Sequence, residues 1–277
     1  MKKKLVSTFD FTVTGEKFDI IFNIETKIAK TVPCPKEEKM VEYYRSTKYH
    51  SHNKPSNLFI SFLYNCVQKI MFKNKVDLIK KYVSEGSKLL DFGSGLGKFP
   101  IFANKIYKIQ AVEPIIYNSN FAVKKGIKFK KSIENYNLKK FDAITFWHSL
   151  EHVYKLNRLL ENLRKNLKKN TYIFVAIPNL MSYDAIKYKN YWAGYDVPRH
   201  LNHFTRTGIK KIFENFNFKL IETKPLFFDS FYVSYLSETY RKSKFPILRG
   251  FYNGLVSNIF AFKTKEFSSN IFVFKKS

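Results

Sequence analysis

The sequence contains few of the residues that define small, fibrous or membrane-spanning proteins. Its only cysteines are Cys34 and Cys66, which excludes a disulfide framework and a zinc site of four thiolates. The 10 glycines and 9 prolines are too few for a collagen-like or Pro/Gly-rich disordered chain. No apolar run reaches the roughly 18 residues of a membrane span, and charged residues interrupt the segment after the basic N-terminus, where a signal peptide would be apolar. We therefore expect a cytoplasmic protein without a membrane span.

Acidic residues are also scarce. The 22 Asp and Glu face 49 Lys and Arg, which gives a formal net charge of +27. Such a charge suggests nucleic-acid binding, because basic side chains neutralise phosphates. Only seven of the 49 are arginines, however, and arginine is the side chain suited to bidentate contact with phosphates and bases. The lysines are also spread along the whole chain, so a solvated basic surface is the preferred interpretation, and nucleic acid is an alternative partner that is not favoured.

Apolar side chains are abundant: 45% of the residues are hydrophobic and 18% are aromatic, enough to bury a sizeable core. Strand-like segments alternate with helical patterns, which predicts a mostly parallel sheet covered by helices on both faces. We expect an α/β fold with a doubly wound, Rossmann-like sheet of seven strands and an N-terminal extension. The expected strands are residues 88–92, 109–113, 127–129, 143–147, 171–177, 218–223 and 270–275.

The chain is expected to divide into a β-rich capping extension, residues 1–56, and a core domain, residues 57–277. Within the extension, residues 8–14 and 18–24 have strand-like patterns, and a helical pattern follows at 37–45. No repeat, low-complexity linker or Pro/Gly/Ser-rich hinge marks any further boundary. The sequence therefore predicts one large domain with an appended module.

Three segments of the core domain have distinct patterns. Residues 150–168 predict a long helix, because five leucines form one apolar stripe beside a charged face. Residues from about 180 to 206 are expected to form a lid or substrate insert. The aromatic-rich segment 225–262 is expected to pack in the core. The alternatives for this segment are a ligand pocket, a dimer surface or a contact with lipid. The protein is expected to be a monomer or a homodimer.

A glycine-rich turn follows the expected strand at 88–92. Gly93, Gly95 and Gly97 are spaced by two residues, and a helical pattern begins directly after them. Glycine lets the backbone turn tightly and lets a ligand approach where a Cβ would clash. In a doubly wound sheet such a turn lies at the carboxyl ends of the strands, where ligands bind. The turn is therefore the strongest candidate for a ligand site.

The residues around the turn indicate which ligand it binds. Lys98 stands where the dinucleotide fingerprint requires its third glycine, and Phe92 and Phe99 stand where a P-loop requires Gly and Ser or Thr. Glu113 ends the next strand, 22 residues after Asp91, which suits a carboxylate that binds both hydroxyls of a ribose. The pattern favours an adenosine ligand without a pyrophosphate.

With these motifs the sequence resembles class I S-adenosylmethionine-dependent methyltransferases over most of its length. Residues 91–97 are similar to the first motif of that family, and 112–114 (Val-Glu-Pro) to its second. Residues 141–147 are similar to the fourth-strand motif, which continues into Leu-Glu-His-Val at 150–153. The resemblance implies S-adenosylmethionine as the cofactor and a small-molecule acceptor.

Within that family the closest resemblance is to the ubiquinone-biosynthesis-type small-molecule methyltransferases. Residues 191–205 (YWAGYDVPRHLNHFT) are similar to a motif that follows the fifth strand in this subgroup. The pair Tyr43-Tyr44 and the stretch Tyr49-His50-Ser51-His52 resemble the extension that caps the cofactor. The resemblance thus assigns the lid and the N-terminal extension to the neighbourhood of the active site.

The resemblance also implies roles for individual residues. Asp91 and the turn after it would hold the methionine moiety, Glu113 would hold the ribose, and Ile133 would border the adenine. Trp147 and His148 would lie under the cofactor. The cofactor-binding residues implied in this way are Asp91, Gly93, Ser94, Gly95, Gly97, Glu113, Pro114, Ile133, Trp147 and His148.

Methyl transfer to a hydroxyl would require a general base near neutral pKa, and histidine is the obvious type. His200 is the first candidate because it lies in the expected lid; His152 is the second, although it more simply anchors its helix by a hydrogen bond. Arg199 could hold an anionic group of the acceptor. The candidate substrate residues are Trp192, Tyr195, Arg199 and His203.

A metal site competes for some of these residues. His148, Glu151 and His152 fit the H-x-x-E-H pattern of inverted zinc proteases. The pattern begins at the end of an apolar strand rather than within a helix, and no third ligand segment is apparent. His200 and His203 form a second pair, but Pro198 and the capping residues Thr205 or Thr207 indicate a loop that leads to a helix. We expect no metal.

The sequence therefore predicts a methyltransferase that acts on a small molecule, with oxygen as the expected accepting atom. An RNA methyltransferase is one alternative. A protein that binds S-adenosylmethionine without catalysis is the other. The motifs of adenine-N6 and cytosine-C5 methyltransferases are absent after the strand at 143–147, where the sequence continues His-Ser-Leu.

Overall fold

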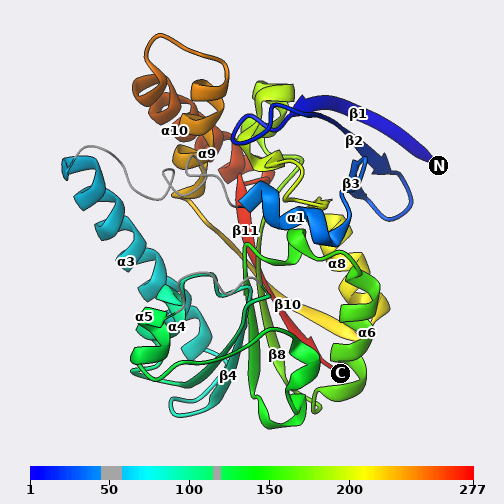
Figure 1. The fold of residues 1–277 in the computed structure, drawn as a ribbon, viewed down its shortest axis with the longest axis vertical. Helices are drawn as coiled ribbons and strands as arrows, with labels where there is room; N and C mark the ends of the chain where they lie inside the picture. The colour runs from blue at the N-terminus through cyan, green and yellow to red at the C-terminus, as the bar shows by residue number, and fades with distance from the viewer. Residues whose placement is uncertain (45–57, 115–119) are drawn as a thin grey trace.

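The computed structural model describes residues 1–44, 58–114 and 120–277. Its centre is a seven-stranded sheet in the order β10-β11-β8-β7-β4-β5-β6 (Figure 1). Strands β4 to β8 are mutually parallel, and β11 pairs antiparallel with both β8 and β10. The strands are β4 (Lys88–Phe92), β5 (Lys108–Val112), β6 (Lys128–Lys130), β7 (Ala143–Trp147), β8 (Tyr172–Pro178), β10 (Phe218–Pro225) and β11 (Ser269–Lys276). The predicted doubly wound α/β fold is confirmed, and each predicted strand of this sheet agrees to within two residues.

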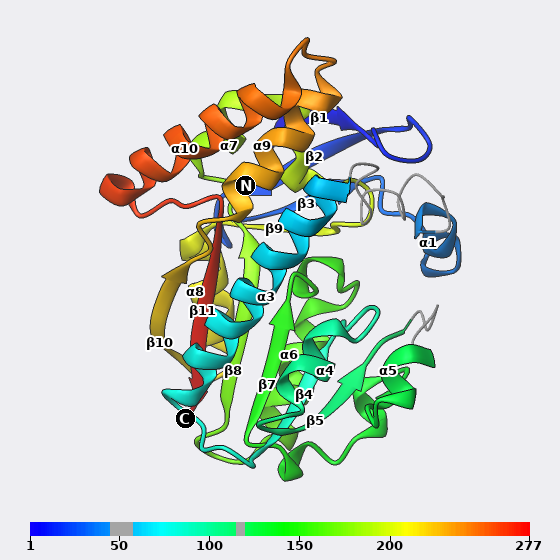
Figure 2. The same cartoon turned by 90° about the vertical axis from the view of Figure 1, so that its left-hand side faces the viewer.

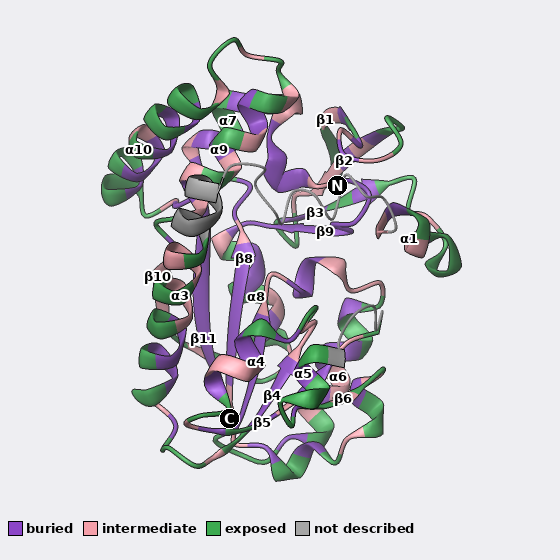
Figure 3. Cartoon of the chain, turned by 60° about the vertical axis from the view of Figure 1, so that its left-hand side comes forward, coloured by how far each residue is buried: buried purple, intermediate pink, exposed green. Residues whose placement is uncertain are grey.

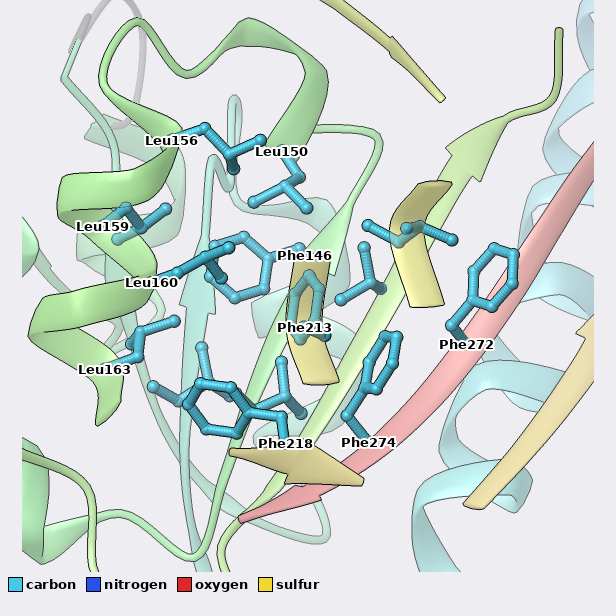
Figure 4. Close-up of a cluster of buried hydrophobic side chains, with 14 of the residues drawn as sticks. Phe146, Leu150, Leu156, Leu159, Leu160, Leu163, Phe213, Phe218, Phe272 and Phe274 are labelled. Atoms are coloured by element: carbon cyan, nitrogen blue, oxygen red, sulfur yellow. The ribbon is translucent and has the colours of Figure 1, made fainter. Parts of the chain in front are cut away.

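Helices cover both faces of this sheet, as Figure 2 shows. On one face lie α3 (Leu58–Lys80), α4 (Lys98–Ala103) and α5 (Asn120–Lys124), whose apolar residues share a core cluster with β4, β5 and β11. On the other lie α6 (Leu156–Asn166) and α8 (Arg206–Asn215). Figure 4 shows the leucines of α6 meeting the phenylalanines of α8, β10 and β11. The helix at α8 begins as predicted, because the Thr205 side chain accepts a hydrogen bond from the Gly208 N–H at 3.0 Å.

The predicted helix at 150–168 is interrupted. A short 3-10 turn, η3 (Leu150–His152), is separated from α6 by an extended residue, Val153. The carbonyl of Glu151 accepts the Leu201 N–H at 2.9 Å, and the carbonyl of Val153 accepts from Asn202 Nδ2 at 2.7 Å. These carbonyls bond to a distant segment instead of to the next helical turn. The predicted helix is therefore correct over α6 and wrong for the six residues before it, 150–155.

A second sheet of four strands lies at the carboxyl end of the first, in the order β1-β2-β3-β9. Its strands β1 (Lys2–Phe9), β2 (Lys17–Asn23) and β3 (Ile28–Val32) come from the N-terminal extension, and β9 (Asn202–Phe204) comes from the lid. The prediction of a strand at 8–14 is wrong, because Asp10 accepts the backbone N–H groups of residues 12, 13 and 14 and closes a turn there. The helix at 37–45 is confirmed as α1 (Glu37–Tyr44).

The segment predicted to be a lid, residues 180–206 and called the lid below, contains α7 (Tyr183–Tyr188), two 3-10 turns, η4 (Lys189–Tyr191) and η5 (Ala193–Tyr195), and strand β9. Its apolar side chains form one cluster with those of the N-terminal sheet and α1. Pairing of β3 with β9 in antiparallel register aligns Ala29 with His203. The lid and the extension therefore share one core. The stretch 49–52, which was expected to cap the cofactor, lies outside the described residues.

The aromatic segment forms a helical hairpin of α9 (Asp229–Tyr240) and α10 (Pro246–Thr264). The two helices pack closely through glycines of α10, since a Cβ at Gly250 would come within 2.5 Å of the backbone of Tyr235. The outer face of α10 is exposed, including Leu248 and Phe251, so the expected core packing holds for only one side of the hairpin (Figure 3). Within the described part of the chain, no helix is both long and apolar enough to cross a membrane.

Candidate active site

The glycine turn connects β4 to α4 at the carboxyl end of the central strand. Gly93, Gly95 and Gly97 all have left-handed backbone angles, with φ of 71°, 51° and 73°. A Cβ at Gly93 would lie 2.3 Å from that of Ser149, and one at Gly97 would lie 2.6 Å from that of Ala122. A Cβ at Gly95 would meet nothing within 4 Å. Two of the glycines are thus required for packing, whereas Gly95 faces open space beside the turn.

Two carboxylates flank this turn. Asp91 is 2% exposed and accepts a hydrogen bond from Thr145 Oγ1 at 2.5 Å; burial raises its pKa to about 6. Glu113 accepts the Gly95 N–H at 2.7 Å through Oε2. Ser94 donates its hydroxyl to the Asp91 carbonyl at 2.8 Å, which fixes the start of the turn. The acids at the ends of β4 and β5 therefore lie on either side of the loop, as the sequence predicted.

The other predicted cofactor residues surround the same edge of the sheet. Pro114 follows β5 and is exposed, and Ile133, which is buried, begins the turn η1 (Ile133–Asn135) after β6. Trp147 ends β7, and His148 follows it with a φ of 54°. The predicted residues come from four adjacent strand ends, which is the position where α/β sheets bind ligands.

Trp147 supplies an observation that bears on the charge of a ligand. Its indole N–H is buried and has no hydrogen-bond partner among the described residues. The ammonium of Lys75, from α3, lies 4.6 Å from the centroid of its ring, and burial lowers the Lys75 pKa to about 8. The ring face thus already accommodates a cation. Sequence reasoning missed Lys75, because a lysine in an apolar helical pattern gives no signal of its own.

His148 is held between two carboxylates. Its Nε2 lies 3.1 Å from Asp229 Oδ2 at the start of α9, and its Nδ1 lies 3.6 Å from Glu151 Oε1. Burial alone would lower the His148 pKa, but Asp229 and Glu151 outweigh it and raise the pKa to about 9. His148 is therefore an imidazolium at neutral pH. Asp229 was also missed from sequence, since it lies some 80 residues away in an aromatic segment.

The two predicted catalytic histidines lie together behind this site. The rings of His152 and His200 are 4.7 Å apart between centroids, in an edge-to-face arrangement. His152 Nδ1 lies 2.9 Å from the Arg199 carbonyl, and His200 Nδ1 lies 2.9 Å from the Gly194 carbonyl. Because a carbonyl can only accept, each Nδ1 carries a proton, and the lowered pKa of His152 leaves a lone pair on its Nε2.

Glu151 faces both histidines. It is fully buried, and neither carboxylate oxygen has a hydrogen-bond partner among the described residues. Its Oε1 lies 3.8 Å from His200 Nε2. Burial would raise the Glu151 pKa, but His148 and His200 outweigh it and hold the pKa at about 2; burial and His200 lower the His152 pKa to about 4. The premise that no third segment approaches Glu151 and His152 is wrong, because His200 reaches them from the lid.

The predicted substrate residues are buried in the lid. Trp192 donates its indole N–H to Asp184 Oδ2 at 2.8 Å, and Tyr195 packs edge-to-face on His203. His203 Nε2 lies 2.9 Å from Thr31 Oγ1 of β3. A small cavity adjoins this group; its lining residues are Glu151, Pro178, Leu180, Trp192, Gly194, His200, Asn202, His203 and Phe204.

Arg199 occupies a position different from the expected one. It is 1% exposed, and its guanidinium bonds to Asp196 Oδ1 at 2.7 Å and to Asp10 Oδ1 at 3.0 Å. Its pKa is raised well above the usual value, since the two aspartates outweigh the opposing effect of burial. A guanidinium committed to two buried carboxylates joins parts of the protein, which favours a structural role over the predicted contact with an anionic acceptor.

The family is decided by a match that spans this site. A family model described as a methyltransferase domain matches residues 67–223, more than half of the chain, and includes β4 to β9. The chain belongs to this methyltransferase family. It is an S-adenosylmethionine-dependent methyltransferase, which confirms the predicted enzyme class and cofactor. The carboxylates of Asp91 and Glu113 and the open side of Gly95 fit a cofactor that carries an ammonium and a ribose.

Solved structures share the fold of this methyltransferase. The 1,6-didemethyltoxoflavin-N1-methyltransferase of Burkholderia thailandensis, solved with 1,6-didemethyltoxoflavin and S-adenosylhomocysteine, is 11% identical, with a TM-score of 0.54 over 92% of this chain and 98% of that one. A Thermotoga maritima S-adenosylmethionine-dependent methyltransferase, described as a possible histamine N-methyltransferase, is 18% identical, with a TM-score of 0.51 over 74% and 89% of the two chains.

The cyclase SpnF also has this fold, with 14% identity and a TM-score of 0.52 over 73% of this chain and 80% of that one. No curated protein matches the methyltransferase by sequence. The fold alone thus accommodates more than one chemistry, so the acceptor has to be argued from the residues of the site.

Proposed function

We propose that the methyltransferase acts at an oxygen atom of a small-molecule acceptor, in the manner of the ubiquinone-biosynthesis-type enzymes that its lid motif resembles. The observation that carries this proposal is the convergence of His152 and His200, whose ring centroids lie 4.7 Å apart, with Nδ1 of each ring at a backbone carbonyl. A hydroxyl acceptor needs a group that accepts its proton, and His152, whose pKa is lowered to about 4, supplies one. The enclosed lid favours a small acceptor over a nucleic-acid strand.

We further propose that the turn after β4 and the acids beside it hold the cofactor. Asp91 would take the ammonium of the methionine moiety and Glu113 the ribose hydroxyls, while Trp147 and His148 would lie under the cofactor. Ile133 and Pro114 would border the adenine. Gly95 would let the cofactor approach the backbone, since nothing within 4 Å occupies the place of its Cβ.

When bound, the cofactor supplies an electrophilic methyl group, so little covalent chemistry is required of the protein. The residues of the site have to place the acceptor oxygen in line with the methyl–sulfur bond and exclude water. As the acceptor oxygen is methylated, Nε2 of His200 or His152 would accept the proton of the hydroxyl. Trp192, Tyr195 and His203 would shape the acceptor side of the lid, with Arg199 supporting it.

This proposal is tested by calorimetry followed by a turnover assay. S-adenosylhomocysteine should bind to the full chain. If it does not bind, the proposed cofactor site is wrong. Phenols and catechols should accept methyl from labelled S-adenosylmethionine, in contrast to matched anilines and amines. Turnover only with the nitrogen acceptors would show that oxygen is not the accepting atom.

The two alternative functions predict other results in the same experiments. An RNA methyltransferase would bind RNA tightly in raised salt and would label it, whereas binding through lysines alone would vanish with salt. A non-catalytic cofactor sensor would bind S-adenosylhomocysteine and turn over no acceptor.

We also propose that residues 1–56 act as a cap on the core domain, residues 57–277. The apolar cluster that the N-terminal sheet and α1 share with the lid supports this proposal.

A further inference from the structure

We propose that the methyltransferase binds a single divalent transition-metal cation of the zinc type through Glu151, His152 and His200. One ligand atom of each side chain lies within 4.8 Å of the others. Two of these residues adjoin each other in η3, and the third comes from the lid, 48 residues further along the chain. One carboxylate oxygen and two imidazole nitrogens are a ligand set that zinc and related cations prefer.

The orientation of the two imidazoles supports the site. Both rings donate Nδ1–H to a backbone carbonyl, of Arg199 for His152 and of Gly194 for His200, at 2.9 Å in each case. A histidine that ligates a metal characteristically donates its other ring N–H to a carbonyl or carboxylate, which fixes its tautomer and its direction. The backbone therefore leaves Nε2 of both rings available to a cation.

The carboxylate gives independent support. Glu151 is 0% exposed, and both its oxygens lack a hydrogen-bond partner among the described residues. Burial of a carboxylate costs free energy, which the His148 imidazolium at 3.6 Å from Glu151 Oε1 offsets in part. His200 Nε2 lies 3.8 Å from Glu151 Oε1, and a metal cation between these two atoms would complete the compensation.

The surroundings limit the size of the occupant. The cavity beside Glu151 and His200 has a volume of about 10 Å³, which suits one water molecule or one ion rather than an organic group. The ligand atoms have to approach by about 1 Å to reach the separations of a tetrahedral site. Asp196 Oδ2, at 3.9 Å from His200 Nε2, adds negative charge beside the three ligands.

The metal site adds a chemical role to the proposed function, but metal binding itself does not depend on that function. Three protein ligands leave a coordination position open, as in catalytic zinc sites. A hydroxyl acceptor that reached this position would lose its proton to solvent instead of to Nε2 of His200 or His152, because these atoms would then be metal ligands and a cation lowers the pKa of an oxygen that it binds. This consequence rests on the proposed methyl transfer to oxygen, whereas the metal site itself can be tested without any acceptor.

The test uses the untagged full-length chain. After chelation and dialysis, Zn²⁺ and Co²⁺ are titrated, with cobalt absorption reporting the ligand field, and S-adenosylhomocysteine binding is measured on the same samples. One equivalent of metal should bind, with at least tenfold weaker binding for Glu151→Gln and for His200→Asn. His203→Asn is the matched control and should keep the stoichiometry, because its Nε2 is engaged by Thr31.

Two outcomes would overturn the inference. One is a wild-type chain that takes up no metal although it binds S-adenosylhomocysteine; a shared proton then bridges Glu151 and His200, and the proposed methyltransferase site stands. The other is metal binding that Glu151→Gln and His152→Asn leave unchanged, which would place the metal elsewhere. Metal binding without cofactor binding would instead contradict the proposed cofactor site alone.

Discussion

Arg199 Nη2 donates a hydrogen bond to Asp10 Oδ1 at 3.0 Å, across 189 positions of the sequence. Both side chains are buried, and Asp196 completes the group with a second bond to the same guanidinium. The arginine also donates to the Tyr43 carbonyl. The turn after β1, the end of α1 and the lid are thus joined at one charged centre beside the proposed acceptor site.

Replacement of Arg199 should mainly affect stability. Arg199→Met would leave Asp10 and Asp196 buried near each other without their partner, and loss of one member of a buried ion pair costs about 3–5 kcal/mol. Urea denaturation should show a loss of that size. The matched control is Arg158→Met, whose pair with Glu134 is exposed on both sides and should cost less than about 1 kcal/mol. Full stability together with a raised KM for the acceptor would restore the substrate role that the sequence suggested.

Gly95→Val should abolish binding of S-adenosylhomocysteine while the protein remains folded. The valine would enter the open space beside the turn, where no atom lies within 4 Å of the new Cβ. Its left-handed φ of 51° adds backbone strain, so the control is Gly86→Val, which has a φ of 80° and equally open surroundings away from the site. Calorimetry and circular dichroism on both variants separate strain from blockage. Equal affinities in the two variants would show that Gly95 is not at the site.

Asp91 should make cofactor binding depend on pH. Its pKa is raised to about 6 by burial, so the carboxylate is protonated below that pH and no longer attracts an ammonium. Affinity for S-adenosylhomocysteine should fall by up to roughly tenfold per pH unit below 6. Calorimetry between pH 5 and 8 measures this, with Asp91→Asn as the comparison: its binding should be weak and free of this dependence. A wild-type affinity that is flat over the same range would contradict the proposed role.

The same group should oppose folding at high pH. A carboxyl whose folded pKa lies above its unfolded value binds its proton more tightly when folded, so its contribution to stability falls as pH rises from about 4 to 6. Asp91→Asn should therefore be more stable than the wild type at pH 8, by up to about 3 kcal/mol. Thermal or urea unfolding at pH 5 and pH 8 gives the comparison. If Asp91→Asn is less stable than the wild type at pH 8, the hydrogen bond from Thr145 to the Asp91 carboxylate outweighs the cost of burying that charge.

Glu113→Gln should weaken S-adenosylhomocysteine binding by about 10- to 100-fold, since hydrogen bonds to a charged group contribute about 1.5–3 kcal/mol each. The amide would keep the shape of the side chain and lose the charge that faces the ribose and the Gly95 N–H. Glu85→Gln, an exposed glutamate paired with Lys80, is the control. If the wild type binds a 2′-deoxyribose analogue as well as it binds the ribose form, the assignment of Glu113 fails.

The central sheet could be predicted from sequence because its strands are buried on both faces. Leu89 and Leu90 of β4, both fully buried, belong to short continuous apolar runs, and such runs need no knowledge of distant partners. The glycine turn after β4 was predictable for a similar reason, since its glycines and Asp91 lie within seven residues.

The rest depends on contacts between distant segments. Strand β9 exists because its three residues pair with β3, and its short pattern could not predict this. Likewise the break after Glu151 depends on hydrogen bonds from Leu201 and Asn202. The cluster of Glu151 with His200 could be found only when the lid was placed against η3, so a search for metal ligands confined to neighbouring residues missed it.

The four-stranded sheet also determines how the chain can be shortened. Its outer strand, β1, carries Lys2, Lys3 and Lys4 and an irregularity in register between Lys4 and Val6, features that prevent one sheet edge from pairing with another. The inner end of the sheet, β9, has no such protection, since all three of its residues are buried. Removal of residues 1–32 would turn β9 into a bare edge and promote intermolecular pairing. We therefore expect the N-terminal segment to protect the protein from aggregation, which would constrain its sequence even where it touches no ligand.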